Sequence, residues 1–209
     1  MPSEQQAGAQ AAPGERMTEE DILRAQFYAL LANLLAAPPD AEMLAALRAM
    51  EGDNTDMGQA LAALAAAAGA NVATVSDDYT VLFYGHGAGG SLLPYASSYL
   101  TGFVYEKPLA DLRADMERLG IAPSGARGEP EDHIAFLCEM MHGLIAGTFG
   151  TPLDLAGQKD FFDRHLDPWA GRFFADLAAT PESAFYRAVG RVGGIFMAIE
   201  AAAFSMPGT

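Results

Sequence analysis

Apolar side chains recur every three or four residues through most of this 209-residue chain, and this spacing constrains the fold more than any other feature. The first stripe runs from Leu23 to Leu35 and stops before Pro38, which predicts a helix over that segment. No segment alternates between apolar and polar residues as a strand does, and Asn-Gly and Asp-Gly hairpin turns are absent. The chain is therefore expected to be all-α.

Further helices are outlined by the residues that commonly cap them. The expected starts are Asp40, Ser76, Pro130, Thr151, Asp167 and Thr180, and the expected stops are Gly52, Gly69, Gly85 and Gly120. The helix after Pro130 is apolar on all faces and is expected to be central. These signals predict a single-domain bundle of about nine helices over residues 18–209, preceded by a disordered tail over residues 1–17.

Composition limits the function classes. Hydrophobic residues make up 51% of the chain, which excludes wholesale disorder. The net charge of −15 argues against nucleic acid, since phosphate contacts need clustered Lys and Arg. An acidic surface favours a basic partner, although acidity alone also keeps a protein in solution.

The remaining composition signals concern compartment and chemistry. The single cysteine, Cys138, lies in an apolar helical run and is expected to be a buried thiol. The N-terminal residues lack the apolar core of a signal peptide, and no apolar run is expected to span a membrane, so a cytoplasmic protein without stable membrane insertion is predicted. The four histidines are scattered, and no H-E-x-x-H or C-x-x-C pairing and no G-x-S-x-G elbow occur, so no metal, no cofactor and no enzymatic activity are predicted.

The most informative motif is an acidic and imidazole cluster at a helix entrance, Glu129-Pro130-Glu131-Asp132-His133. Pro130 suits a first helical turn, and Glu131 and Asp132 place negative charge at the positive end of the helix dipole. Asp132 can accept a guanidinium in a bidentate pair, and His133 can donate to a peptide carbonyl. The alternative is a helix N-terminus that simply carries favourable charges.

A second motif is rich in aromatic residues. Its first part reads Tyr79-Thr80-Val81-Leu82-Phe83-Tyr84-Gly85, and its second part, after a glycine-rich turn, reads Leu93-Pro94-Tyr95-Ala96-Ser97-Ser98-Tyr99-Leu100. Tyr95, Ser98 and Tyr99 follow a proline in a loop and are expected to line a surface. For Phe83, a core position and a groove position remain open alternatives.

Together these blocks resemble the TorD family of maturation chaperones, whose motifs are E-P-x-D-H and Y-x-x-L-F-x-G…P-Y/W-x-S-x-Y. The resemblance covers most of the chain from about Thr18, including the run Phe161-Phe162-Asp163-Arg164-His165-Leu166-Asp167-Pro168-Trp169. Two departures are Tyr95, where several relatives have tryptophan, and Ala96-Ser97-Ser98, where a glutamate often precedes the serine.

The resemblance implies a TorD-like helical bundle with a flexible hinge over residues 122–128. It implies a dedicated chaperone that binds the apo form of a molybdenum enzyme's catalytic subunit, its twin-arginine leader, or both, and that delays export until the cofactor is inserted. Formate dehydrogenase and the S- or N-oxide reductases are candidate clients, and some family members exchange helices between two copies of the chain or form simple dimers. The implied binding residues are Tyr79, Phe83, Pro94, Tyr95, Ser98, Tyr99, Glu129, Pro130, Asp132 and His133.

One alternative belongs to a different function class. The loop Gly85-His86-Gly87-Ala88-Gly89-Gly90-Ser91 has the glycine spacing of a phosphate-binding loop, which would make the protein a helical nucleotide or small-molecule binder. The loop lacks the lysine that should follow, and it leads to Pro94 instead of a helix. The chaperone hypothesis is therefore the stronger one.

Overall fold

The structure is a computed structural model that describes residues 17–85, 90–122 and 128–206. Over these ranges it contains ten α-helices, one π-helical turn and no strand, which confirms the all-α expectation. The elements are α1 (Glu19–Ala36), α2 (Ala41–Arg48), α3 (Asp56–Ala67), α4 (Val72–Tyr79), η1 (Thr80–Tyr84, the π-helical turn), α5 (Ala96–Thr101), α6 (Lys107–Leu119), α7 (Ile134–Ala146), α8 (Leu155–His165), α9 (Ala170–Ala179) and α10 (Ala184–Ser205).

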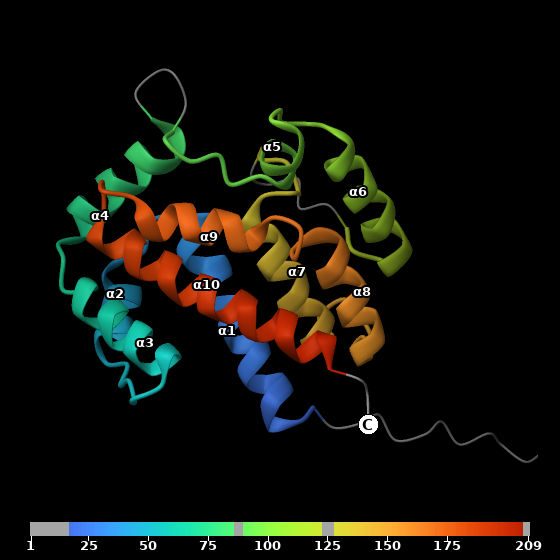
Figure 1. Ribbon diagram of the computed structural model, residues 1–209, viewed down its shortest axis with the longest axis horizontal. Helices are drawn as coiled ribbons and strands as arrows, with labels where there is room; N and C mark the ends of the chain where they lie inside the picture. The colour runs from blue at the N-terminus through green and yellow to red at the C-terminus, as the bar shows by residue number, and fades with distance from the viewer. Residues whose placement is uncertain (1–16, 86–89, 123–127, 207–209) are drawn as a thin grey trace, which may run out of the picture.

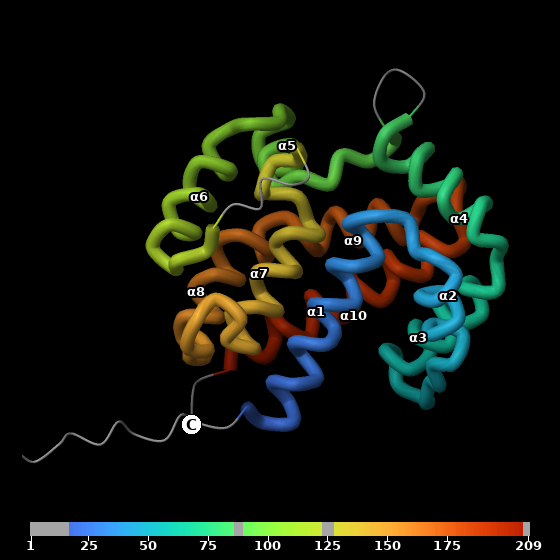
Figure 2. Tube along the Cα trace, turned by 180° about the vertical axis from the view of Figure 1, so that it is seen from behind, coloured from blue at the N-terminus to red at the C-terminus, as the bar shows by residue number. Residues whose placement is uncertain are grey.

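The helices form a bundle around α7 and α1, which pack against each other along their lengths. The pair α9 and α10 lies across them, and α10 also packs on α3 (Figure 1). Seen from either side, α2, α3 and α4 gather at one end of the molecule, and α6 and α8 lie at the other (Figure 2). One hydrophobic core therefore connects helices that are far apart in sequence.

The central position predicted for the helix after Pro130 is confirmed. Nine of the thirteen residues of α7 are buried, including Leu137, Cys138 and Met141. Burial raises the pKa of the Cys138 thiol, so this cysteine remains protonated and packs as a small apolar side chain.

A buried ion pair ties α1 to α10. The Arg24 guanidinium donates to both oxygens of Glu200, at 2.7 and 2.9 Å, and the Tyr28 hydroxyl donates to Oε2 at 2.9 Å. Arg24 also donates to Gln158 of α8 at 2.9 Å. Burial alone would lower the pKa of Arg24, but the hydrogen bonds and charge of Glu200 outweigh it and raise the pKa, so the guanidinium stays charged.

Several predicted helix starts were wrong by about one turn. The helix expected at Ser76 begins at Val72, because Asn71 caps it by accepting from the Ala73 amide at 2.8 Å. The helices expected at Thr151, Asp167 and Thr180 have their N-caps at Asp154, Trp169 and Ser183. In two of these helices a downstream side chain, Asp154 or Ser183, supplies the capping bond, and the X-Pro pair belongs to the turn before the helix.

Two apolar segments bear on the expectation that no apolar run spans a membrane. The 22-residue α10 is long and apolar enough to do so by length and composition, as is the bent pair formed by α3 with α4 and η1. Half of the most apolar stretch of α10 is buried inside the bundle, where Val189 and Val192 contact the core. The helix therefore has the packing of a core helix.

Candidate ligand-binding site

The two sequence motifs meet through their backbones. Tyr95 and His133 form an isolated antiparallel β-bridge. The Ile134 amide donates to the Pro94 carbonyl at 2.8 Å, and the Ala96 amide donates to the Asp132 carbonyl at 3.0 Å. This bridge joins the entrance of α7 to the entrance of α5.

The bridge also moves the start of α7. The helix was expected to begin at Pro130, but it begins at Ile134, with His133 as an extended N-cap residue at ψ 137°. The His133 Nδ1 accepts from the Ala135 amide at 3.1 Å, so this nitrogen carries no proton. Because the bridge uses the backbone groups on both sides of His133, Glu131 and Asp132 lie in a turn before the helix instead of in its first turn.

A cavity of about 170 Å³ opens beside the bridge. Its lining comes from α1, α4, η1, α7 and the segment before α7, and consists of Ala36, Tyr79, Tyr84, Glu129, His133 and Phe136. Tyr79, Glu129 and His133 were predicted as binding residues. Tyr84 was missed, although it ends the same aromatic motif, because only its neighbours match the family pattern.

Glu129 connects the cavity to Tyr95. The Tyr95 hydroxyl donates to the Glu129 carboxylate, and the Tyr95 ring lies edge-on to His133 with a centroid distance of 5.2 Å. Burial, together with this carboxylate, raises the pKa of Tyr95, so the hydroxyl stays protonated and remains a donor. Glu129 is partly exposed and can accept a second donor from a ligand.

Asp132 has a structural contact that the sequence did not indicate. Its side chain is 1% exposed, and Oδ2 accepts from the Ser97 amide at 2.8 Å and from the Ser97 hydroxyl at 2.5 Å. The carboxylate therefore caps the first turn of α5 from across the bridge. The other oxygen, Oδ1, is buried and finds no hydrogen-bond partner among the described residues.

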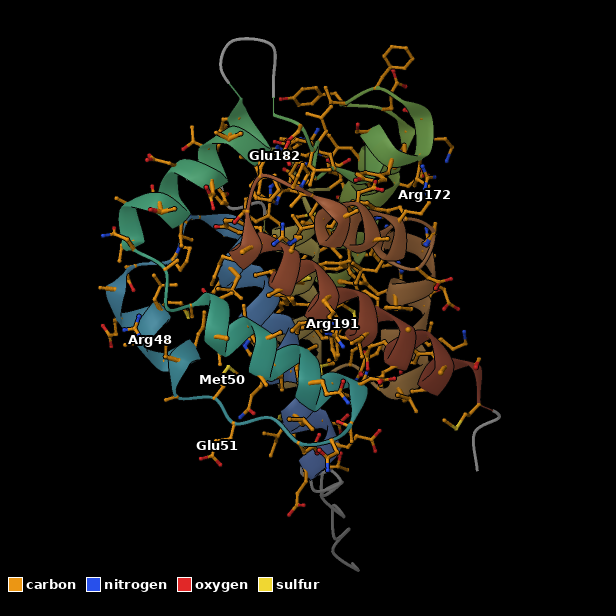
Figure 3. All side chains as sticks on the ribbon, turned by 60° about the vertical axis from the view of Figure 1, so that its left-hand side comes forward. Arg48, Met50, Glu51, Arg172, Glu182 and Arg191 are labelled. Atoms are coloured by element: carbon orange, nitrogen blue, oxygen red, sulfur yellow. The ribbon has the colours of Figure 1, made fainter. Side chains whose placement is uncertain are left out.

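Ser98 and Tyr99 lie apart from the cavity, on α5. The Tyr99 hydroxyl donates to Asp176 of α9 at 2.9 Å, and the Arg172 guanidinium stacks over the Tyr99 ring at 5.7 Å. Figure 3 shows Arg172 at the same end of the molecule as α5 and α6. Tyr99 thus joins α5 to α9, and Ser98 is half-buried on the same short helix.

Three other predicted residues are buried. Phe83 packs in the aromatic core against Tyr79 and Tyr186, which favours the core alternative for this residue. Pro94 and Pro130 are buried on the two sides of the bridge, where Pro94 accepts the backbone bond from Ile134. These residues shape the site from below its surface.

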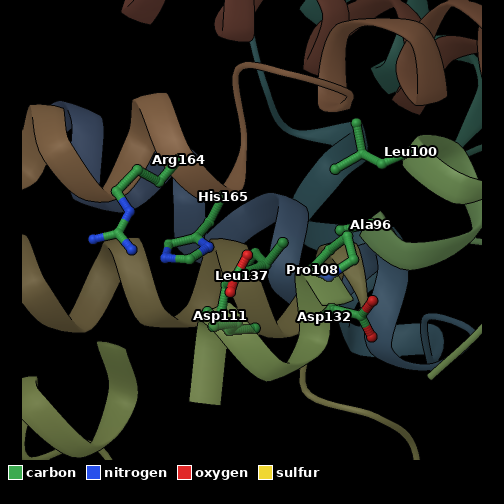
Figure 4. A pocket seen from close by; sticks show the side chains of 9 residues that line it. Ala96, Leu100, Pro108, Asp111, Asp132, Leu137, Arg164 and His165 are labelled. Atoms are coloured by element: carbon green, nitrogen blue, oxygen red, sulfur yellow. The ribbon is translucent and has the colours of Figure 1, made fainter. Parts of the chain in front are cut away.

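On the other side of Asp132 lies a smaller cavity of about 100 Å³ (Figure 4). Its lining is Ala96, Leu100, Pro108, Asp111, Leu112, Asp132, Leu137, Arg164 and His165. Arg164 and His165 are both engaged with Asp115 of α6, at 2.9 and 2.7 Å. Burial lowers the pKa of His165 despite the Asp115 carboxylate, so the imidazole is neutral and donates its Nε2 proton.

A third cavity, also of about 100 Å³, adjoins the first, because Glu129 and Phe136 line both. It has an apolar lining and an acidic rim, and its residues are Met116, Ile121, Ala122, Glu129, Glu131, Phe136, Glu139, Met140 and Phe149. Glu131 is paired with Arg113 at 2.7 Å. Glu129 is thus the acidic side chain shared by both cavities.

Two features of the sequence hypothesis fall largely outside the described residues. These are the central residues of the glycine loop, 86–89, and most of the hinge, 123–127. Among the residues that the structure describes, no group of three or more His, Cys, Asp or Glu side chains could hold a metal ion.

Comparison with known proteins assigns the chain to a family. The sequence profile described as "Nitrate reductase delta subunit" matches residues 50–175, a range that includes both motifs and the bridge between them. The chain belongs to the TorD and nitrate reductase delta subunit family.

Individual relatives agree with this assignment. The protein named "Chaperone protein TorD" from Aliivibrio fischeri is 31% identical over 123 residues, which is 55% of this chain and 57% of that protein. The protein of the same name from Vibrio atlanticus is 30% identical over 112 residues, half of each chain. The chain thus spans about half the length of the curated relatives it matches. These relatives are named as chaperones, in agreement with the prediction of a non-enzymatic protein.

Proposed function

We propose that this protein is a cytoplasmic maturation chaperone that binds an apo molybdenum enzyme, through its twin-arginine leader, its catalytic subunit or both. The observation that carries the proposal is the cavity where Tyr79, Tyr84, Glu129 and His133 meet. An aromatic wall with a carboxylate at its edge suits a peptide that has a basic head and an apolar run. The names of the relatives and the family match support the chaperone class.

The proposed mechanism is differential binding without covalent chemistry. Glu129 accepts the leader guanidinium, and the Tyr95 hydroxyl holds the carboxylate in place. Asp132 acts as a positioning residue, because its bonds to Ser97 fix the bridge on which Tyr95 and His133 sit. The client is retained while its leader is accessible and released when the leader is withdrawn.

Client identity and self-association are part of the same proposal. Formate dehydrogenase and the S- or N-oxide reductases are the candidate clients, and a simple or helix-exchanged dimer is the candidate assembly. Co-elution of the chaperone with each purified apo catalytic subunit, with and without its leader, ranks these clients. Failure to bind any of them contradicts the client assignment.

The central experiment is calorimetric titration of the full chain with a synthetic twin-arginine leader peptide. Glu129→Gln removes the charge and keeps the shape, so affinity is expected to fall by about 10- to 100-fold, the value of a lost charged hydrogen bond. Glu51→Gln is the matched control, because Glu51 is exposed at the opposite end of the molecule from α5 and α6 (Figure 3). Equal affinities of the two variants would remove Glu129 from the site.

A further inference from the structure

Five large apolar side chains are exposed near the bridge. Phe103 and Tyr105, in the connection between α5 and α6, are 70% and 67% exposed. The set, which we call the aromatic ridge, consists of Tyr84, Leu93, Phe103, Val104 and Tyr105.

The backbone of the α5–α6 connection is held in a defined shape. Gly102 ends α5 in the left-handed conformation, at φ 84°. The Thr101 hydroxyl accepts from the Phe103 amide at 3.2 Å and lies 2.8 Å from the Ser97 carbonyl, to which it donates. Tyr105 also has a left-handed backbone, at φ 64°, and is the sole non-glycine residue with positive φ in the described ranges.

The ridge is continuous with the candidate site. Tyr84 lines the same cavity as Glu129 and His133, and Glu129 accepts a hydrogen bond from the Tyr95 hydroxyl. The Leu93 carbonyl accepts from the Tyr95 amide at 2.8 Å. Both views of the chain place the α5–α6 connection and the segment before α5 at the same end of the molecule (Figures 1 and 2).

The left-handed backbone conformation of Tyr105 is unfavourable for an aromatic residue. A bulky side chain at positive φ is an outlier that the surrounding structure must enforce, and such outliers cluster at ligand sites. The exposed rings contribute little to the core, and contiguous exposed apolar surface marks interaction sites. The exposed rings and the left-handed backbone of Tyr105 therefore point to an interaction site.

We propose that the aromatic ridge binds the apolar run of a client leader, while Glu129 binds the basic residue beside that run. This inference rests on the proposed function and adds the position of the apolar segment. It assigns binding roles to Phe103, Val104 and Tyr105, which lie outside both sequence motifs.

Charge favours this occupant over a second copy of the chain. Each copy carries a net charge of −15, so two copies repel one another, whereas a basic leader is attracted. Lys107, the cation that follows the ridge in sequence, is paired with Asp111. The acidic Glu129 therefore sets the sign of the charge next to Tyr95 and the ridge.

The test uses three synthetic peptides and the full chain. The first peptide has an arginine pair followed by a leucine run, the second has serines in place of the leucines, and the third has glutamines in place of the arginines. The ridge variant carries Phe103→Ser and Tyr105→Gly, and glycine is suited to φ 64°. The matched control carries Leu155→Ser and Ile199→Ser, which change side chains 61% and 50% exposed outside the ridge.

The ridge variant is expected to bind the leucine peptide about tenfold or more weakly, with an unchanged melting temperature, and to lose the preference for leucine over serine. The control should bind like the wild type. An unchanged leucine preference in the ridge variant overturns the inference and leaves the proposed function intact. A change from dimer to monomer with unchanged peptide affinity also overturns it, since the ridge would then be a self-interface. If the wild type binds none of the peptides, the leader proposal itself fails.

Discussion

Two acidic side chains in this molecule are equally buried but differently satisfied. Glu200 and Asp132 are each 1% exposed. Both oxygens of Glu200 accept hydrogen bonds from Arg24 or Tyr28, whereas Asp132 has two bonds on one oxygen and none from the described residues on the other. Glu200 therefore closes a structural contact between α1 and α10, while Asp132 holds the bridge at the candidate site with acceptor capacity left over.

The largest expected effect on stability is at Glu200, the fully hydrogen-bonded side chain. Glu200→Ala leaves the Arg24 guanidinium buried without its main partner, so the free energy of unfolding should fall by about 3–5 kcal/mol. Urea denaturation measures this loss. The double variant Arg24→Met with Glu200→Leu should recover most of it, because two apolar side chains leave no buried charge. A loss below that of Asp132→Ala would contradict the comparison.

A smaller loss is expected at the bridge. Asp132→Ala removes the two bonds to Ser97 and should lower the free energy of unfolding by about 1–3 kcal/mol. Hydrogen exchange at the Ser97 amide should accelerate more than exchange within α7. Wild-type protection at Ser97 would show that the carboxylate does not cap α5.

The His165–Asp115 contact and the Arg24 side chain should also differ in how their contributions to stability respond to pH. Burial lowers the pKa of His165, and the nearby Arg164 acts in the same direction against Asp115 and Asp111. Below about pH 6.5, the ordinary histidine value, the unfolded chain takes up the proton first. Stability contributed by neutral His165 is thus present above pH 6.5 and is lost as pH falls toward its lowered folded-state pKa.

Unfolding midpoints at several pH values between 7 and 5 check this sign. His165→Gln keeps a donor for Asp115 but does not titrate, so its stability should fall less than that of the wild type. Arg24 remains charged throughout this range, so its guanidinium adds no such slope. Parallel profiles for the variant and the wild type would exclude His165 as the cause.

The smallest effect separates two tyrosines. Tyr99→Phe loses a partly exposed bond to Asp176 and should cost about 0.5–1.5 kcal/mol of unfolding free energy without changing leader affinity. Tyr95→Phe loses the bond to Glu129 and should weaken leader binding. Calorimetry and thermal melting on both variants provide the comparison. Weaker leader binding by Tyr99→Phe alone would move the site toward α9.

Periodicity and capping predicted the helical fold because these signals are local. The apolar faces of α7 and the Gly120 stop of α6 are confirmed. The bridge was not predictable, because its bonds join residues about 35 positions apart, and no local pattern reports them. The same reason explains why α5 was expected to be a loop: the carboxylate that caps it belongs to Asp132.

The candidate site was predictable in part. Tyr79, Glu129 and His133 converge on one cavity, as the two motifs suggested. Tyr99 and Phe83 contact neighbouring helices instead, where Asp176 and Tyr186 are their partners. The binding roles of all these residues remain predictions until a client is titrated.

The π-helical turn η1 carries a consequence for sequence change. The Gly85 amide bonds to the Thr80 carbonyl five residues back, so this turn holds one residue more than an α-helical turn. Deletion of a single residue here would convert the wide turn into an ordinary α-helical turn, because the extra residue is accommodated within the turn itself. Side chains on either side of the turn would keep their orientation, and Tyr79 would stay in the core. Insertions and deletions in this one turn are therefore a simple route by which relatives could change in length without altering the bundle.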